Sequence, residues 1–385
     1  MPLLCIMTFM EPALFDELDR MLPGASPAAA LDFLIGEFRR RGEYALLFEA
    51  KLMKRRAELG VPLIQTAPLP EDKRAAYDET VIATARETGA LFLAEGNIER
   101  AWPYFRAIGE HGPVRDAIGK YGPGEDDDPE GIIDIAYQQG VYPAKGLALI
   151  LSRHGMCRAI TVFGMYGSAT EREECAVLLI ANLYQELRDN LKGVVERHEG
   201  ERPASESIAE LIGGREWLFG EYDYYIDTSH LSSVIQYAAD ITDRTALGQI
   251  RELCCYGRRL SVNFRIQGHP PFENIYEDYD AYAAALLGDG TEDAIAHFRR
   301  KVEESDVEET LAAQVLVQLL LKLNRESEAM ELALERLAHK APNEISCPPA
   351  MHLCRMAGDY EALRRLAREK GDVLSYAAAA LESRG

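Results

Sequence analysis

The stretch Asp289-Gly290-Thr291-Glu292-Asp293-Ala294 ends one helix, makes a tight turn and opens the next helix with a small residue. An earlier copy of this pattern is Glu95-Gly96-Asn97-Ile98-Glu99-Arg100-Ala101, and two later copies are Asn324-Arg325-Glu326-Ser327-Glu328-Ala329 and Gly358-Asp359-Tyr360-Glu361-Ala362-Leu363. The last three copies place their small or apolar residue at positions 294, 329 and 363, so the spacings are 35 and 34 residues. A period of about 34 residues is typical of a helix–turn–helix solenoid, in which each hairpin buries its apolar face by stacking on the next.

Nearly every long segment repeats its apolar residues at i, i+3, i+4 and i+7, and no clear alternating strand pattern stands out. The sequence therefore predicts an all-α fold, an α-α superhelix of antiparallel helix pairs with an irregular helical middle. We expect helical hairpins over 1–121, a segment with one long helix over 122–198, an irregular middle over 199–280 and regular repeats over 281–385. These segments are expected to form one continuous solenoid.

Several helix ends can be read from local chemistry. Ser26 precedes a helix predicted over 27–40 and can cap it, and Gly42 tolerates the left-handed geometry that ends a helix. A later helix is expected to end at Gly155, and Ser205 or Ser207 is expected to cap the helix that follows the polar break after residue 198. These helix ends are thus predicted from neighbouring residues alone, without any tertiary information.

The best-matched hairpin is predicted over 71–95 and 98–110. Its small and aromatic residues fall at the offsets of the tetratricopeptide pattern, namely Gly89, Phe92, Ala101, Phe105 and Pro113. The stretch therefore resembles the tetratricopeptide-repeat (TPR) family, although Ala85 and Thr88 stand where that pattern has Trp and Leu. The resemblance covers about a third of the chain and implies a TPR-like solenoid with a concave groove that binds a protein or peptide.

The chain is strongly acidic, with 63 Asp and Glu against 42 Lys and Arg and a net charge of −21. No basic run offsets this charge, so we expect neither a nucleic-acid nor a membrane partner, and the acidity favours a basic protein or peptide. The apolar opening ten residues lack the basic start of a secretory signal, and no segment reaches the ~18 apolar residues of a membrane helix. The seven cysteines are an odd number without regular spacing, which predicts reduced thiols in a cytoplasmic protein.

The densest group of reactive side chains lies between Trp217 and His230. Asp227 and His230 stand three residues apart, so at a helix start both could face one side and hold a divalent metal ion. The competing interpretation is that Asp227, or a hydroxyl beside it, caps a helix over 230–239. Tyr224 belongs to the same stretch and is a candidate ligand-binding residue.

A second candidate group is His269-Pro270-Pro271-Phe272-Glu273, in which His269 and Glu273 flank a rigid Pro-Pro segment. This segment either lines a ligand pocket or acts as an aromatic wedge between helices. His154 and Cys157 have a spacing that suits a soft metal, but Cys157 opens an apolar helix and is expected to be a core thiol. The acidic loop over 122–130 lacks the ligand order of a calcium-binding EF-hand. Apart from a divalent metal, no cofactor is expected.

The sequence has no phosphate-binding loop, no dinucleotide-binding glycine turn, no HExxH motif and no Gly-x-Ser-x-Gly motif, which removes the most readily recognised enzyme classes. The leading hypothesis is a protein- or peptide-binding helical-repeat module rather than an enzyme. The rival is an enzyme, or a small-molecule or metal-binding protein, with a site in the irregular middle around Asp227, His230, His269 and Glu273.

Overall fold

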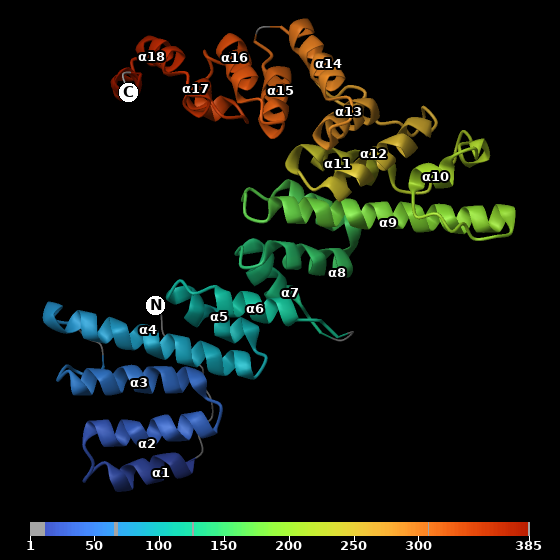
Figure 1. Ribbon diagram of the computed structural model, residues 1–385. Helices are drawn as coiled ribbons and strands as arrows, with labels where there is room; N and C mark the ends of the chain where they lie inside the picture. Colours follow the sequence, from blue (N-terminus) through green and yellow to red (C-terminus); the bar gives the residue numbers. More distant parts are fainter. Residues whose placement is uncertain (1–11, 65–67, 125–126, 307, 384–385) are drawn as a thin grey trace. The chain divides into compact units, whose positions relative to one another are not determined.

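The computed structural model describes residues 12–64, 68–124, 127–306 and 308–383. Over these residues the chain forms 19 α-helices with short 3-10 and π-helical segments and no β-strand. Consecutive helices pack as pairs along the chain (Figure 1). The predicted all-α fold is confirmed. Cys5, the apolar opening, Glu125 and Asp126 lie outside the described residues.

The chain divides into two compact units, Met1–Leu149 and Ile150–Gly385. The first contains α1 (Pro12–Met21), α2 (Pro27–Arg40), α3 (Tyr44–Glu58), α4 (Glu71–Ala94), α5 (Ile98–Ala107), α6 (Gly112–Lys120), α7 (Glu130–Ile133) and a π-helical turn over Asp134–Gln138. The division falls inside α8 (Pro143–Gly164). The boundaries expected from the sequence, at residues 121, 198 and 280, lie elsewhere.

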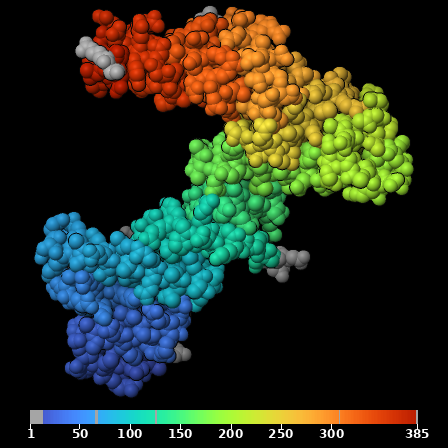
Figure 2. Space-filling view, viewed as in Figure 1, coloured from blue at the N-terminus to red at the C-terminus, as the bar shows by residue number. Residues whose placement is uncertain are grey.

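The second unit continues from α8 through long and short helices to the final hairpins. It contains α9 (Arg172–Glu199), α10 (Ile208–Ile212), α11 (Thr228–Ile235), α12 (Arg244–Arg259), α13 (Ile275–Leu287), α14 (Thr291–Glu304), α15 (Leu311–Lys322), α16 (Glu326–Arg336), α17 (Ala350–Ala357), α18 (Tyr360–Glu369) and α19 (Val373–Glu382). Short 3-10 turns lie at Glu216–Leu218, Gln236–Asp240 and Pro342–Glu344. In the space-filling view, side chains close the gaps that the ribbon leaves between α15, α16 and α17 (orange to red, Figure 2).

The first hairpins form where the sequence predicts them. The Ser26 hydroxyl accepts a hydrogen bond from the Ala29 N–H at 3.2 Å and caps α2, and Gly42 adopts the left-handed φ of 70° that closes the turn into α3. In the next pair, α4 and α5 approach so closely that a Cβ on Gly89 would lie 2.6 Å from the Phe105 ring. Ala101 is fully buried in this contact, as the small residue of the repeat should be.

The second unit also confirms the predicted helix ends. Gly155 has φ 77° and ψ 178°, so it kinks α8 where a helix end is expected. Ser207 caps α10 by accepting a hydrogen bond from the Glu210 N–H at 3.4 Å. The residues that define the period, Ala294, Ala329 and Leu363, are all buried in the second helix of their hairpins.

The expectation that Cys157 is a core thiol is wrong, because its side chain is exposed. The kink at Gly155 sets the phase of the helix that follows, so that Met156, Ala159 and Phe163 face the interior and Cys157 faces away. Cys254 is buried and its neighbour Cys255 is half-buried, because successive side chains on a helix point in different directions. Within the described residues, no helix is both long enough and apolar enough to cross a membrane.

Candidate functional site

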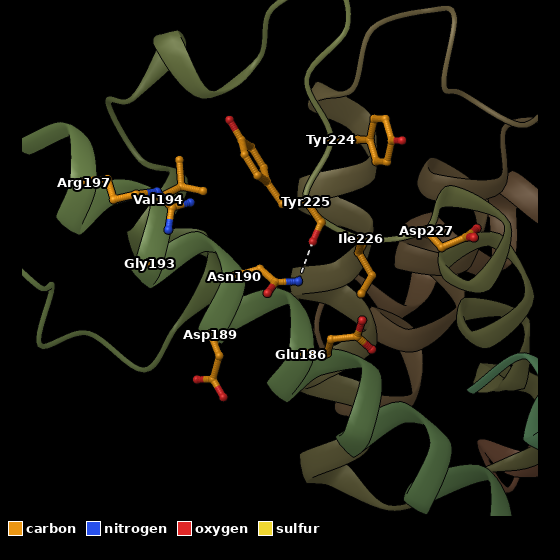
Figure 3. A pocket seen from close by; sticks show the side chains of 10 residues that line it. All are labelled: Glu186, Asp189, Asn190, Gly193, Val194, Arg197, Tyr224, Tyr225, Ile226 and Asp227. Atoms are coloured by element: carbon orange, nitrogen blue, oxygen red, sulfur yellow. Dashed lines mark hydrogen bonds between the residues drawn. The ribbon is translucent and has the colours of Figure 1, made fainter. Parts of the chain in front are cut away.

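Four of the five candidate residues lie at two pockets, both in the second unit, and His230 lines neither pocket. The first pocket has a volume of about 460 Å³ and lies between α9, over residues 186–197, and the segment from Tyr224 to Asp227 (Figure 3). The second has a volume of about 590 Å³ and is lined by His269 and Glu273, together with residues at the end of α14 and the start of α15. The structure therefore places Tyr224 and Asp227 at one pocket and His269 and Glu273 at another.

Backbone hydrogen bonds hold the segment beside the first pocket in place. The Asn190 side chain of α9 donates a hydrogen bond to the Tyr225 carbonyl at 2.8 Å (Figure 3). The Tyr225 N–H donates to the hydroxyl of Tyr256, also at 2.8 Å. Ile226 is buried beneath them. Tyr224 is exposed and contacts Phe264 with a ring separation of 4.8 Å. The segment from Tyr224 to Asp227 is thus held in place by hydrogen bonds and lines the pocket with aromatic side chains.

Asp227 is the N-cap of α11. Its Oδ1 accepts hydrogen bonds from the Ser229 N–H at 2.8 Å, the Ser229 hydroxyl at 2.6 Å and the His230 N–H at 3.3 Å. The hydroxyl of Ser229 is the largest cause of the lowered pKa of Asp227, which lies below its ordinary value of 3.8. The capping interpretation is confirmed, although the helix begins at Thr228 and ends in a 3-10 turn.

His230 occupies the first turn of α11, is half-buried and does not line the first pocket. Its backbone N–H donates a hydrogen bond to Asp227, and the charge of His230 is the smallest of the causes that lower the pKa of that carboxyl. Across the described ranges, no group of three or more His, Cys, Asp or Glu side chains is arranged to hold a metal ion.

The loop that carries His269 and Glu273 is both an aromatic wedge between helices and part of a pocket lining, the two interpretations of the Pro-Pro segment. Phe272 is buried as a wedge against α13 and α14, stacking on Tyr279 at 4.0 Å and meeting the edge of Phe298 at 5.5 Å. Pro270 and Pro271 line the second pocket. The loop can fold this tightly because a Cβ at Gly268 would lie 1.9 Å from the Phe272 carbonyl oxygen.

Beneath the second pocket lies a charged network that the sequence reasoning missed. The Lys301 ammonium lies 2.5 Å from a Glu273 oxygen and 3.1 Å from Asp278, whose carboxylate is fully buried. His297 Nε2 lies 2.7 Å from the other oxygen of Asp278, and the Asn274 N–H donates to Asp278 at 2.9 Å. A buried carboxylate with three partners satisfies the requirement that buried charge be compensated.

The electrostatics of the second pocket follow from this network. Burial works to raise the pKa of Glu273, but the hydrogen bond from Lys301 and the nearby positive charge outweigh it, so that the pKa is lowered. The side chains of Glu304 and Glu309 also line the pocket, and within the described part of the chain neither forms an ion pair. The pocket is therefore acidic, and Lys301, the one Lys or Arg among its described lining residues, is already held by carboxylates.

Comparison with protein-family models, curated proteins and solved structures found no match to this chain. The resemblance to the tetratricopeptide-repeat family consequently stays a prediction from the sequence.

Proposed function

We propose that this protein is a helical-repeat module that binds a basic segment of another protein and that the second pocket is the anchoring point. The observation that supports this proposal is the lining of that pocket. Three carboxylates, those of Glu273, Glu304 and Glu309, border it, whereas the ammonium of Lys301 is bound to Glu273 and to the buried Asp278. A cationic side chain entering the pocket would meet carboxylates with little competing positive charge.

The pocket also offers apolar surface. Leu311, at the start of α15, is 51% exposed, and Pro270 and Pro271 also line the pocket. A ligand with a Lys or Arg beside an aliphatic residue would therefore use both kinds of surface, since apolar contact supplies affinity and charge supplies selectivity. The network under the loop favours this role, because Asp278 and Phe272 fix the backbone that carries Glu273 before any ligand arrives.

The test measures fluorescence anisotropy of labelled peptides with the full chain at physiological ionic strength. We expect a lysine–leucine peptide to bind, and lysine–serine and glutamate–leucine peptides to bind much more weakly. The double variant Glu304→Gln/Glu309→Gln should weaken binding by about 3- to 10-fold, because two exposed charge contacts at about 0.3–0.7 kcal/mol each contribute about 0.7–1.4 kcal/mol together.

The matched control is Glu331→Gln/Glu335→Gln, which makes the same change in net charge on the exposed face of α16. We expect its effect to stay within about twofold, since distant exposed charges are screened. Equal weakening by the two double variants would mean that net charge alone attracts the peptide. That outcome, or a failure of the lysine–leucine peptide to bind, would overturn the proposal.

One observation favours a second candidate function, the binding of a small ligand in the first pocket. This concave pocket of about 460 Å³ is lined by two of the candidate residues, Tyr224 and Asp227, together with the amide of Asn190 and the guanidinium of Arg197. A metal-dependent version, in which Asp227 at the pocket and His230 beside it hold the ion, can be tested by calorimetric titration of Zn²⁺ and Mn²⁺ into the protein and into His230→Ala. Heat that is lost in the variant would support the metal role of His230, and identical titrations would refute it.

The cytoplasm is the proposed compartment for this interaction. The six cysteines in the described part of the chain are free thiols, and four of them are buried, as suits a reducing compartment.

A further inference from the structure

One side of the first pocket is a single face of α9. The residues of this helix that line the pocket have the spacing i, i+3, i+4, i+7, i+8 and i+11, which is that of one helical stripe. They are Glu186, Asp189, Asn190, Gly193, Val194 and Arg197. With a rise of 1.5 Å per residue, the first and the last begin about 16 Å apart along the helix. The pocket is thus an elongated groove with Glu186 at one end and Arg197 at the other (Figure 3).

Gly193 lies in the middle of this stripe and is the only glycine among the 28 residues of α9. A Cβ at this position would meet nothing nearer than the guanidinium of Arg197 at 3.5 Å, which is ordinary van der Waals contact. Neither backbone geometry nor packing within the described chain therefore requires glycine here, although glycine weakens a helix interior relative to alanine. A ligand that lies close against the helix backbone does require it.

The two ends of the groove carry opposite charges. Among the described residues, neither the carboxylate of Glu186 nor the guanidinium of Arg197 has a hydrogen-bond or ion-pair partner. Asp227 adds a second carboxylate on the side away from Arg197 (Figure 3), and only its Oδ1 is used by the cap of α11. Asp189, between the two ends, is paired with Arg188. The groove therefore offers negative charge at one end and positive charge at the other.

We infer that the ligand of the first pocket is an elongated zwitterion, with its amine at Glu186 and Asp227 and its carboxylate at Arg197. This inference rests on the second candidate function and is independent of peptide binding at the second pocket. Because Arg197 folds back toward Gly193, the charges that the ligand must bridge lie roughly 10–15 Å apart along the helix. An extended peptide of three or four residues with free ends spans about 10–14 Å, and a long ω-amino acid has a similar reach.

The middle of the groove suits a chain that joins two charged ends. Tyr225 is half-buried and presents its ring to the groove, which gives an alkyl chain or a peptide plane a surface to pack on. Asn190 uses one of its two N–H donors on the Tyr225 carbonyl, so its second N–H and its carbonyl oxygen can pair with an amide. The hydrogen bond from the Tyr225 N–H to Tyr256 holds this lining in place before any ligand arrives.

Calorimetric titration of four probes into the full chain at low ionic strength tests the inference. Tetraglycine and ω-aminoundecanoate are zwitterions of suitable length, whereas diaminodecane and undecanedioate carry like charges at both ends. We expect both zwitterions to bind, and the diamine and the dicarboxylate to bind about fivefold more weakly, because each brings a like charge to one end of the groove. Tighter binding of tetraglycine than of ω-aminoundecanoate would identify a peptide as the source of this chemistry, and the reverse order an aliphatic ligand.

Reversing one end of the groove should reverse the preference. Arg197→Glu places negative charge at both ends, so this variant should bind diaminodecane more tightly than either zwitterion. The control is Arg158→Glu, which makes the same change of charge at an exposed side chain of α8 and should keep the wild-type preference. Retention of the wild-type preference by Arg197→Glu would overturn the inference.

Gly193→Ala tests the close approach to α9. The added methyl group should weaken binding of both zwitterions by about tenfold, yet the melting temperature should rise because alanine favours the helix. Gly248→Ala in α12 is the control, since no heavy atom lies within 4 Å of an added Cβ there, and it should raise the melting temperature without affecting binding.

The outcomes separate this inference from the candidate function on which it rests. Diamine or dicarboxylate binding that equals zwitterion binding and is weakened by Gly193→Ala would overturn the inference, while small-ligand binding in the first pocket would stand. Zwitterion binding that Gly193→Ala leaves unchanged would also overturn the inference. Absence of binding by all four probes would overturn both.

Discussion

Replacing Gly89 with Ala tests the contact on which the best-matched repeat depends. Gly89 lies in the buried part of α4, and a Cβ at this position would lie 2.6 and 2.8 Å from two carbon atoms of the Phe105 ring of α5. Real Cβ atoms essentially never come this close to another heavy atom. The ring would have to move, yet Phe105 is only 1% exposed and is enclosed by the neighbouring helices.

Two opposing effects decide the magnitude. Ala is a better helix former than Gly by about 1 kcal/mol, which by itself would stabilise α4. Overpacking a well-filled core costs about 1–3 kcal/mol, because side chains leave their preferred rotamers and the backbone shifts. With the ring unable to move freely, we expect the cost of overpacking to exceed the gain in helix propensity and Gly89→Ala to destabilise the protein by up to about 2 kcal/mol.

Urea denaturation followed by circular dichroism measures this difference. Gly36 provides the control, since it lies in the interior of α2 with no heavy atom within 4 Å of an added Cβ. Gly36→Ala should therefore stabilise the protein by up to about 1 kcal/mol. The same substitution is thus predicted to have opposite signs at two helical positions of one unit.

A double-mutant cycle with Phe105→Leu identifies the cause. If overlap with the ring is responsible, Gly89→Ala should cost less in the Leu background than in the wild type, and the coupling should exceed about 0.5 kcal/mol. Stabilisation by Gly89→Ala similar to that by Gly36→Ala would refute the argument, because it would show that α4 and α5 do not touch tightly at this point.

Three further predictions concern other elements. Ala294→Trp should lower the free energy of unfolding by about 2–3 kcal/mol, because the side chain is buried in the hairpin; an unchanged melting temperature would show that the repeat register is wrong. Asp227→Ala should cost about 1 kcal/mol through loss of the α11 cap, whereas Asp227→Asn should retain most of it, as thermal melts can show. Burial works to raise the pKa of Glu173, but hydrogen bonds from Thr242 and Asp243 lower it below its ordinary value of 4.5. The ionised Glu173 carboxylate therefore stabilises the folded protein above pH 4.5. This contribution is lost as the pH falls through the lower pKa of the folded state. Glu173→Gln should thus reduce the drop in melting temperature between neutral and acidic pH, and an unchanged drop would contradict this assignment.

Local chemistry explains why the helices could be predicted so well. Caps such as Ser26, Ser207 and Asp227 act within three residues, and the left-handed Gly42 acts on its own turn. Because these interactions need no tertiary partner, the sequence contains them completely. The burial of Ala294 followed for a similar reason, since the hairpin period places it at a contact whatever the neighbouring hairpin contains.

Features that depend on contacts between elements could not be predicted in the same way. Cys157 lies beside an apolar run, and only the phase set by the kink at Gly155 decides that it faces outward. The division between Leu149 and Ile150 falls within a helix that has no break in composition at that point, so no linker signal marks it. His269 and Glu273 were identified as candidates, but the pocket they line is completed by α14 and α15.

The buried network around Asp278 could have been predicted from the sequence, although the sequence analysis did not identify it. Asp278 stands on the buried stripe of α13 between Ile275 and Tyr282, where a lone carboxylate would be too costly to bury without a partner. The turn at residues 289–290 predicts an antiparallel hairpin, and positions 278 and 301 are equally far from its centre. Lys301 is therefore the expected partner of Asp278, and the structure places its ammonium 3.1 Å from that carboxylate. The position of a turn can thus predict a charge pair that anchors a pocket wall, whereas the ligand of that pocket depends on chemistry outside the chain.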